Sequence, residues 1–472
     1  MIAAGAPANT AASSAKPQRV AVIGAGAAGL CAAKNLLARG VDVVVYEIGT
    51  CIGGLWVYNN DSGLAPAYKS LHLNSETKVT EYRDFPFPPG SPLYPDHVGV
   101  RRYLESYAEH FAVLPHIRFK SKVVDVSPRG EGWRVKLEAG PSDGTTDGRI
   151  EDFDAVVVAS GHQGSPSHPT WKDDFKGEYL HSHTYRVPEP FRDKRVLVVG
   201  MGNSAVDIAS DICVVTQSTT IAARSPVLVM PRMLFGVPTS RVLGRIEKDW
   251  MPWAFKRTVR ELLVRIVHGS MEQWGFTTPK TRTHPTSHPC LMSHFVWNRI
   301  TAKPGIASVL GQTVRFVDGS SETYDTVIAG TGYDVSLPFL APALRPLNGH
   351  RPELFLRVVH PQQRGLYFAG LFNVAGGGNI RMMDDQAEWI AELVCGDMSL
   401  PDDAAMRHAM ADEQAYLQRH FPGSPRYSLE LDPPFYRKQL ARERQLSRTR
   451  PRAPRAATPT SASTTGGGSV AA

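Results

Sequence analysis

Two glycine-rich segments have the residue types and spacing that bind the pyrophosphate of a dinucleotide. Each follows a β-rich run and opens into a stretch of helix formers. The glycines allow a tight turn with no side chain between backbone and anion, and N–H groups at the helix N-terminus face that anion. Two dinucleotide sites are therefore predicted. The residues concerned are Gly24, Ala25, Gly26, Ala27, Ala28 and Gly29 in the first, and Gly200, Met201, Gly202, Asn203, Ser204 and Ala205 in the second.

The residue that ends the next strand distinguishes the two nucleotides. After the first turn, the predicted strand 41–46 ends in Glu47, whose carboxylate can accept hydrogen bonds from a ribose 2′-OH, as in FAD. After the second turn, the strand 220–223 ends in Arg224, followed by Ser225. A cation and a hydroxyl suit a 2′-phosphate, which favours NADPH over NADH. The alternative is that Glu47 and Arg224 are ordinary surface charges.

Length and composition restrict the class of protein. A chain of 472 residues is long enough for two interleaved domains, and its 42% hydrophobic content is ordinary for a globular enzyme. No run approaches 18 uninterrupted apolar residues, so we expect no membrane span and a cytoplasmic location. Residues 437–472 hold eight Lys or Arg and one Glu, which account for the whole net charge of +7. The body is close to neutral, so a nucleic-acid partner is not expected.

Cysteine and histidine usage argues against two further kinds of site. The five cysteines are scattered without a CxxC pair, which weighs against a flavin-dependent disulfide reductase. His284, His288 and His294 form a cluster, but Pro285 and Pro289 break the helix that would place the first two on one face. We expect no metal site.

The elements around the two turns predict an α/β fold with two Rossmann-like dinucleotide-binding domains, the NADPH domain inserted into the FAD domain. A βαβ unit, a helix near 99–111, a strand pair near 123 and 133 and a strand 155–160 precede a second βαβ unit. A hydrophobic strand at 326–329 mirrors 156–161, and another strand covers 365–370. The division is a disordered arm over 1–18, FAD domain over 19–169 and 291–440, NADPH domain over 170–290, and a disordered basic tail over 441–472.

Two further segments have open interpretations. Gly376, Gly377 and Gly378 precede a helix from about 383 to 395, which suits close approach to the flavin or a loop without ligand contact. The segment 255–267 is a basic amphipathic helix, with Phe255 and Leu262 on its apolar stripe. Core packing or subunit contact is the favoured interpretation of that stripe, and a membrane surface is the alternative.

Between the two turns, residues 175–185 fit the pattern FxGxxxHxxx(Y/F) at every fixed position, from Phe175 to Tyr185. With this segment the chain resembles the flavin-containing monooxygenases, which use NADPH and O₂ to oxygenate soft nitrogen and sulfur. The resemblance spans about residues 19–400. It includes the segments 53–56, 68–71, 74–75, 84–88, 202–204 with Asp207, 331–333 and 338–340. In the related Baeyer–Villiger enzymes the pattern ends in Trp followed by Pro or Asp, whereas Tyr185 and Arg186 stand here.

The resemblance implies FAD and NADPH as cofactors, a small amine or sulfide and O₂ as substrates, and a C4a-hydroperoxyflavin sheltered by bound NADP⁺. It assigns the catalytic role to Asn74, whose amide is donor and acceptor without a titratable proton; capping of a local turn is the alternative. Further cofactor contacts are implied at Gly54, Leu55, Trp56, Leu73, Ser75 and Gly332. His181 and Tyr185 are expected to be structural.

Three functional alternatives remain at this point. The first is N- or S-oxygenation. The second is Baeyer–Villiger or oxidative-decarboxylating chemistry on a carbonyl compound. The third is a flavin-binding redox sensor that lacks turnover. A homodimer is left open.

Overall fold

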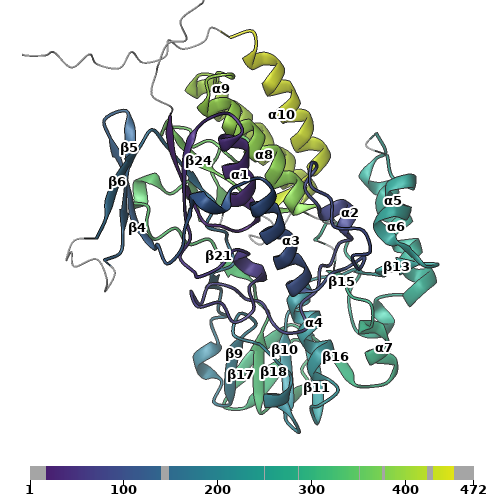
Figure 1. Ribbon diagram of the computed structural model, residues 1–472. Coiled ribbons are helices and arrows are strands. Elements are labelled where there is room, and N and C mark those ends of the chain that lie inside the picture. The colour runs from purple at the N-terminus through teal and green to yellow at the C-terminus, as the bar shows by residue number, and fades with distance from the viewer. Residues whose placement is uncertain are drawn as a thin grey trace, which may run out of the picture.

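The computed structural model describes residues 18–139, 148–248, 250–284, 286–349, 351–374, 378–421 and 429–450. Two parallel five-stranded sheets dominate it (Figure 1). This is the predicted α/β class with two Rossmann-like units. The first 17 residues, Gly376, Gly377 and residues 451–472 lie outside the described residues, so the expectations for the arm, the end of the tail and most of the glycine run concern segments that are not described.

The first sheet is built around β1 (Arg19–Ile23), which pairs in parallel with β2 (Asp42–Tyr46) on one side and β7 (Ala155–Val158) on the other. β24 (Leu366–Phe368) extends the sheet beside β7, and β3 (Ile117–Arg118) beside β2. β1, β2 and β7 are almost wholly buried because both faces are covered. The helices α1 (Ala27–Leu37), α3 (His97–His110) and α8 (Asn379–Val394) share one core with this sheet.

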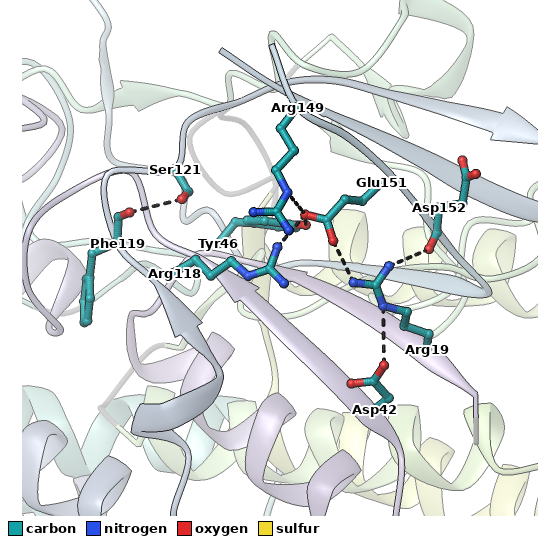
Figure 2. A network of polar contacts seen from close by, with 9 residues as sticks. All are labelled: Arg19, Asp42, Tyr46, Arg118, Phe119, Ser121, Arg149, Glu151 and Asp152. Atoms are coloured by element: carbon teal, nitrogen blue, oxygen red, sulfur yellow. Dashed lines mark hydrogen bonds and ion pairs between the residues drawn. The ribbon is translucent and has the colours of Figure 1, made fainter. Parts of the chain in front are cut away.

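A three-stranded antiparallel sheet, β4 (Val123–Arg129), β5 (Gly132–Leu137) and β6 (Ile150–Phe153), covers the opposite face. Figure 2 shows the polar cluster that joins it to the first sheet around Glu151. Glu151 accepts hydrogen bonds from Arg19 (2.6 Å) and Tyr46 (2.9 Å), and it also pairs with Arg118. Burial opposes ionisation of Glu151, but these contacts outweigh it and lower the pKa of the carboxyl. The cluster fixes β6 against β1, β2 and β3.

The second sheet has the order β16-β11-β10-β20-β9, all parallel. Its strands are β9 (Glu178–His181), β10 (Arg195–Val199), β11 (Ser218–Ala223), β16 (Ile300–Pro304) and β20 (Thr326–Ala329). α4 (Asn203–Ile212) and α7 (Leu291–Val296) pack on one face. The small antiparallel sheet β17 (Ile306–Leu310), β18 (Thr313–Phe316) and β19 (Ser321–Thr323) packs on the other.

The strand pairing disagrees with the expected end of the NADPH domain at residue 290. β16 and β20 lie beyond residue 290, yet both pair within the second sheet, because their hydrophobic strands complete the layer around β10. β8 (Ser165–Pro166) pairs with β21 (Tyr333–Asp334) where the chain enters and leaves this unit. We therefore propose that the inserted unit ends near residue 332, and that the return to the first sheet is made by β24.

The remaining helices and short strands flank the two units. α10 (Pro433–Ser447) buries Tyr436 and Leu440 in the first core and also buries Glu443 and Ser447, so the expectation of disorder from residue 441 is wrong as far as Ser447. The others are α2 (Thr77–Thr80), α5 (Thr239–Ile246), α6 (Trp253–His268), α9 (Asp403–His420), β12 (Val229–Met230), β13 (Met233–Leu234), β14 (Val237–Pro238), β15 (Thr286–Ser287), β22 (Leu347–Asn348), β23 (Arg351–Pro352), β25 (Asn373–Val374) and β26 (Glu430–Leu431). Among the described helices, none combines the length and apolar character that crossing a bilayer requires.

Candidate functional site

The first glycine turn joins the end of β1 to the start of α1 in a conformation that only glycine fits. Gly24 has φ of +106°, and a Cβ placed on it would lie 2.6 Å from the carbonyl oxygen of Ala159. A Cβ on Gly29 would lie 1.8 Å from the carbonyl oxygen of Gly24. The turn is thus closed tightly on itself and on the residue that follows β7.

Glu47 lies directly behind this turn. Its carboxylate accepts hydrogen bonds from the N–H of Ala25 (2.7 Å) and the N–H of Gly49 (2.8 Å), and it is buried. The end of β2 therefore holds the turn in place through Glu47. The sequence analysis predicts that the ribose of FAD binds beside Glu47.

A second glycine pair approaches the turn from outside. The N–H of Gly53 donates to the carbonyl of Ala25 (3.3 Å), and a Cβ on Gly54 would lie 3.1 Å from the Cα of Gly26. Gly26 caps α1 and supplies no side chain, so the first N–H groups of α1 have no side-chain acceptor there. Leu55 is exposed beside this approach, while Trp56 packs against the first core.

Asn74 lies in a loop that is anchored on both sides. The N–H of Leu73 donates to the carbonyl of Pro95 (2.9 Å), and the hydroxyl of Ser75 lies 2.7 Å from that of Thr80. Asn74 itself is exposed and makes no hydrogen bond to the described residues. The capping alternative is wrong, because Glu76 occupies the N-cap position of α2 and no side chain caps that helix.

Glu76 is a site residue that the sequence analysis missed. It is buried, and its two carboxylate oxygens accept from the hydroxyl of Ser240 (2.8 Å) and from Nε of Arg241 (2.6 Å). These donors belong to the first turn of α5, some 165 residues away in sequence. In the sequence, the only indication of a role for Glu76 is its position directly after Asn74 and Ser75. No neighbouring residue indicates that its partners lie in α5.

The second glycine turn repeats the geometry of the first. Gly200 has φ of +115°, and a Cβ on it would lie 2.5 Å from the carbonyl oxygen of Gly330, which follows β20. Gly202 caps α4 without a side chain. The side chain of Asn203 accepts a hydrogen bond from the N–H of Ser287 (3.2 Å). Ala205 is buried against Gly330, and Ser204 is partly buried.

Arg224 emerges beside the second turn. β11 pairs in parallel with β10 with Ala222 opposite Val199, so the residues after both strands reach the same sheet edge. Arg224 is exposed and has no ion-pair partner in the described part of the chain. Gly332, with φ of +91°, lies at the same edge, and its carbonyl accepts from the N–H of Ser167 (3.0 Å).

Hydrogen bonds hold the segment before Asn74 against the second unit. The hydroxyl of Tyr68 donates to Asp207 (2.7 Å), and the hydroxyl of Ser70 donates to Asp211 (2.8 Å). Tyr185, which ends the 175–185 pattern, also donates to Asp211 (2.5 Å). Asn74 is four residues from Ser70, which limits its distance from that contact to about 14 Å of extended chain. Glu76, two residues beyond Asn74, contacts α5, so Asn74 lies between two residues that both contact the second unit.

Burial sets the protonation of the groups around this contact. It raises the pKa of Asp207 to about 6, although the hydrogen bond from Tyr68 opposes the shift. Burial lowers the pKa of His288, whose Nε2 lies 3.6 Å from Asp207, to about 3. Burial and the neighbouring His168 and His183 lower the pKa of His181 to about 4. Both histidines are neutral at pH 7.

No group of three or more His, Cys, Asp or Glu able to hold a metal is found within the described ranges. In the expected histidine cluster, His284 contacts Glu430 (2.9 Å) and His288 contacts Asp207, so the two rings have separate partners. The five cysteines are free thiols in the structure.

Comparisons with known proteins relate this chain to one family. Residues 17–441 match the family model described as flavin-binding monooxygenase-like. Flavin-containing monooxygenase 5 of Oryctolagus cuniculus is 30% identical, over 88% of this chain and 80% of that protein. The 4-hydroxybenzoate brominase (decarboxylating) of Marinomonas mediterranea is 28% identical, over 90% and 83%.

Solved structures share the fold. The S-allyl-L-cysteine S-oxygenase of Allium sativum superimposes with a TM-score of 0.68 at 26% identity, covering 91% of this chain and 89% of that one. A cyclohexanone monooxygenase superimposes with a TM-score of 0.66 at 16% identity, covering 92% and 98%. At 16% identity, the likeness to the cyclohexanone monooxygenase concerns the fold alone.

Proposed function

Because the chain belongs to the flavin-binding monooxygenase-like family, we propose that it uses FAD, NADPH and O₂ to oxygenate a soft nitrogen or sulfur atom of a small molecule. When bound, FAD would accept hydride from NADPH and deliver oxygen from O₂ to the substrate. The protein's own residues hold the two nucleotides, orient them and exclude water.

The first glycine turn fits FAD. The close approach of Gly26 and Gly54 forms a cradle that any side chain would fill, and the free N–H groups at the start of α1 suit a pyrophosphate. Glu47 lies at the adjoining strand end, where it can accept from the ribose hydroxyls while it holds Ala25. Leu55, Trp56, Leu73 and Ser75 would line the path toward the flavin ring.

The second turn fits NADPH. Gly200 and Gly202 leave the N-terminus of α4 open to a pyrophosphate. Arg224 offers an exposed, unpaired guanidinium at the same edge, which can make charge-assisted hydrogen bonds to a 2′-phosphate. Asn203, Ser204, Ala205 and Gly332 complete this edge.

The observation that carries the proposal is the placement of Asn74. Its amide is exposed and without a hydrogen-bond partner among the described residues, in a loop tied both to the first unit and to the second. An amide held there can orient the nicotinamide ribose or the oxygen-bearing face of the flavin without donating a titratable proton. A group without a titratable proton suits oxygenation, because a stray acid near the flavin would favour release of peroxide instead.

Oxidation at nitrogen or sulfur is favoured over carbonyl oxidation by the end of the 175–185 pattern. Tyr185 is buried there with its hydroxyl on Asp211, and Arg186 folds back onto the carbonyl of His183 (2.7 Å). Trp at position 185 has no hydroxyl to donate to Asp211, and Pro or Asp at position 186 has no cation to donate to that carbonyl. The S-oxygenating relative from Allium sativum is in line with this preference.

The test offers the FAD-loaded protein an amine, a thioether and a cyclic ketone in parallel, with NADPH in air. We expect an N-oxide or S-oxide by mass spectrometry, with NADPH consumed in proportion. Ester formation from the ketone without S-oxidation would overturn the proposal in favour of Baeyer–Villiger chemistry. A yellow protein that consumes no NADPH with any substrate would support the redox-sensor alternative.

A further inference from the structure

The apolar stripe of α6 faces solvent. Phe255, Val259, Leu262 and Ile266 recur along one side of the helix at helical spacing. Phe255, Leu262 and Ile266 are 53%, 56% and 66% exposed, and Val264 is the one residue of α6 that is buried. Of the two favoured interpretations of this stripe, core packing is therefore wrong and subunit contact stays a prediction.

The charged side of α6 faces the protein instead. Arg260 makes a two-pronged contact with Glu247, with both N···O distances 2.7 Å, and its guanidinium lies over the ring of Trp253. Arg257 donates to the carbonyl of Lys280 (2.7 Å). These contacts fix the rotation of α6 about its axis. The apolar stripe on the opposite side of the helix therefore faces solvent.

Unpaired cations surround the stripe. Arg245, Lys248, Lys256 and Arg265 have no ion-pair partner within the described ranges, and all but Lys256 are exposed. The other basic residues of this region, Arg241, Arg257 and Arg260, are paired with acids. Glu272, just beyond α6, is an exposed acid that interacts electrostatically with Arg265, but the unpaired cations outnumber it among the described residues.

More apolar side chains lie next to the stripe in the chain. Ile246 ends α5, and Trp250, in the connection to α6, is 79% exposed. Phe235 is 97% exposed at the tip of the β13–β14 hairpin, which packs against α5. Figure 1 shows α5, α6 and β13 together at the margin of the molecule, away from the two central sheets.

We propose that this surface docks on an anionic lipid bilayer, with α6 lying in the interface plane. We call it the α6 face and define it by Phe255, Leu262 and Ile266 with Arg245, Lys248, Lys256 and Arg265. Apolar and aromatic side chains enter the headgroup region while flanking cations pair with anionic headgroups. A second copy of the chain fits worse, because a symmetric pairing would bring the same unpaired cations together. The inference does not depend on the redox reaction.

The test measures binding of the full-length FAD-loaded protein to vesicles by flotation. We expect binding to vesicles of equimolar phosphatidylcholine and phosphatidylglycerol, weaker binding to phosphatidylcholine alone, and a decrease with added salt. The double variant Leu262→Ser with Ile266→Ser should bind at least about tenfold more weakly, because two apolar side chains no longer enter the bilayer. Lys256→Gln with Arg265→Gln should lose about fivefold per cation on the anionic vesicles.

A matched control removes exposed apolar side chains elsewhere. Leu310 and Val317 lie at the β17–β19 sheet and are both exposed, so Leu310→Ser with Val317→Ser should leave vesicle binding unchanged. Equal binding of the α6-face variants and the unmodified protein would overturn the proposal, since the basic C-terminal tail is present in all of them. Failure to bind either vesicle, or a dimer in light scattering that the Leu262 and Ile266 variant abolishes, would also overturn it.

Discussion

At the scale of single residues, two exposed and unpaired groups distinguish this site from an ordinary surface. Asn74 and Arg224 each belong to a loop whose neighbours are held by hydrogen bonds or close backbone contacts, yet their own polar atoms have no partner among the described residues. A positioned group without a protein partner is available to a ligand. The next two predictions concern these residues.

Replacing Asn74 by Leu should leave FAD bound and abolish oxygenated product, because the shape of the loop is kept while its amide is lost. NADPH oxidation should stop or be diverted to hydrogen peroxide. Product yield and peroxide are measured together. Asn348→Leu on β22, which makes the same change far from the site, is the control. Full product yield from the Asn74 variant would refute the assignment.

Replacing Arg224 by Ala should weaken NADPH use by about 1.5–3 kcal/mol, roughly tenfold to a hundredfold in kcat/KM, because a charge-assisted contact to the 2′-phosphate is lost. NADH has no such phosphate, so its use should hardly change. Steady-state kinetics with both nucleotides give the comparison, with Arg315→Ala on β18 as control. Equal losses for NADPH and NADH would show that Arg224 does not contact the phosphate.

The raised pKa of Asp207 predicts that the free energy of unfolding of the protein depends on pH. Its carboxyl titrates near pH 6 in the folded protein, against 3.8 as its ordinary value, so folding favours the protonated form. The stability that this group contributes is present below about pH 4 and is lost as the pH rises to about 6. Asp207→Asn removes the ionisation, so its stability relative to the unmodified protein should rise by up to about 3 kcal/mol over that interval. Urea unfolding at several pH values measures this, and parallel pH curves would contradict it.

At the scale of elements, Glu76 forms a clamp with Ser240 and Arg241 that ties α5 to the Asn74 loop, and we expect this clamp to influence the reaction. Glu76 follows Asn74 by two residues, and it accepts hydrogen bonds from the first turn of α5. Glu76→Gln should retain FAD but lower the ratio of product to NADPH consumed, by about tenfold, because a small displacement of the loop is enough to misplace the amide. Glu178→Gln, in the exposed pair with Lys194, is the control. Unchanged coupling in the Glu76 variant would show that the clamp is only structural.

The elements that sequence predicts well are those with a local signal. The first glycine turn, β2 ending before Glu47, and β10 before the second glycine turn all follow from spacing and strand pattern. The orientation of α6 does not, because a stripe of apolar residues has the same pattern whether it faces a core or solvent. Contacts outside the helix, such as those of Arg260 with Glu247 and of Arg257 with the carbonyl of Lys280, decide which. The contacts of Glu76 are likewise formed by residues too far along the chain for any local pattern to indicate.

At the scale of the whole molecule, Asp211 joins three parts of the chain: α4, Ser70 before the Asn74 loop, and Tyr185 at the end of the linker. Asp211→Ala should slow flavin reduction by NADPH about tenfold or more while NADP⁺ affinity changes little, because the two units are no longer held at one distance. Stopped-flow absorbance and nucleotide titration separate these effects, with Asp173→Ala as control. A loss of affinity without slower reduction would place Asp211 in nucleotide binding instead.

The strand pair β8–β21 has a consequence for how such a protein can be rebuilt. Pro166 faces Tyr333 and Ser165 faces Asp334, so the inserted unit begins and ends at neighbouring points. Its whole sheet, from β9 to β20, lies between them, and none of its strands contributes to the sheet that contains β1. A homologous unit could therefore be exchanged as a cassette at these two junctions, which would transfer nucleotide preference between relatives without altering the strand order on either side.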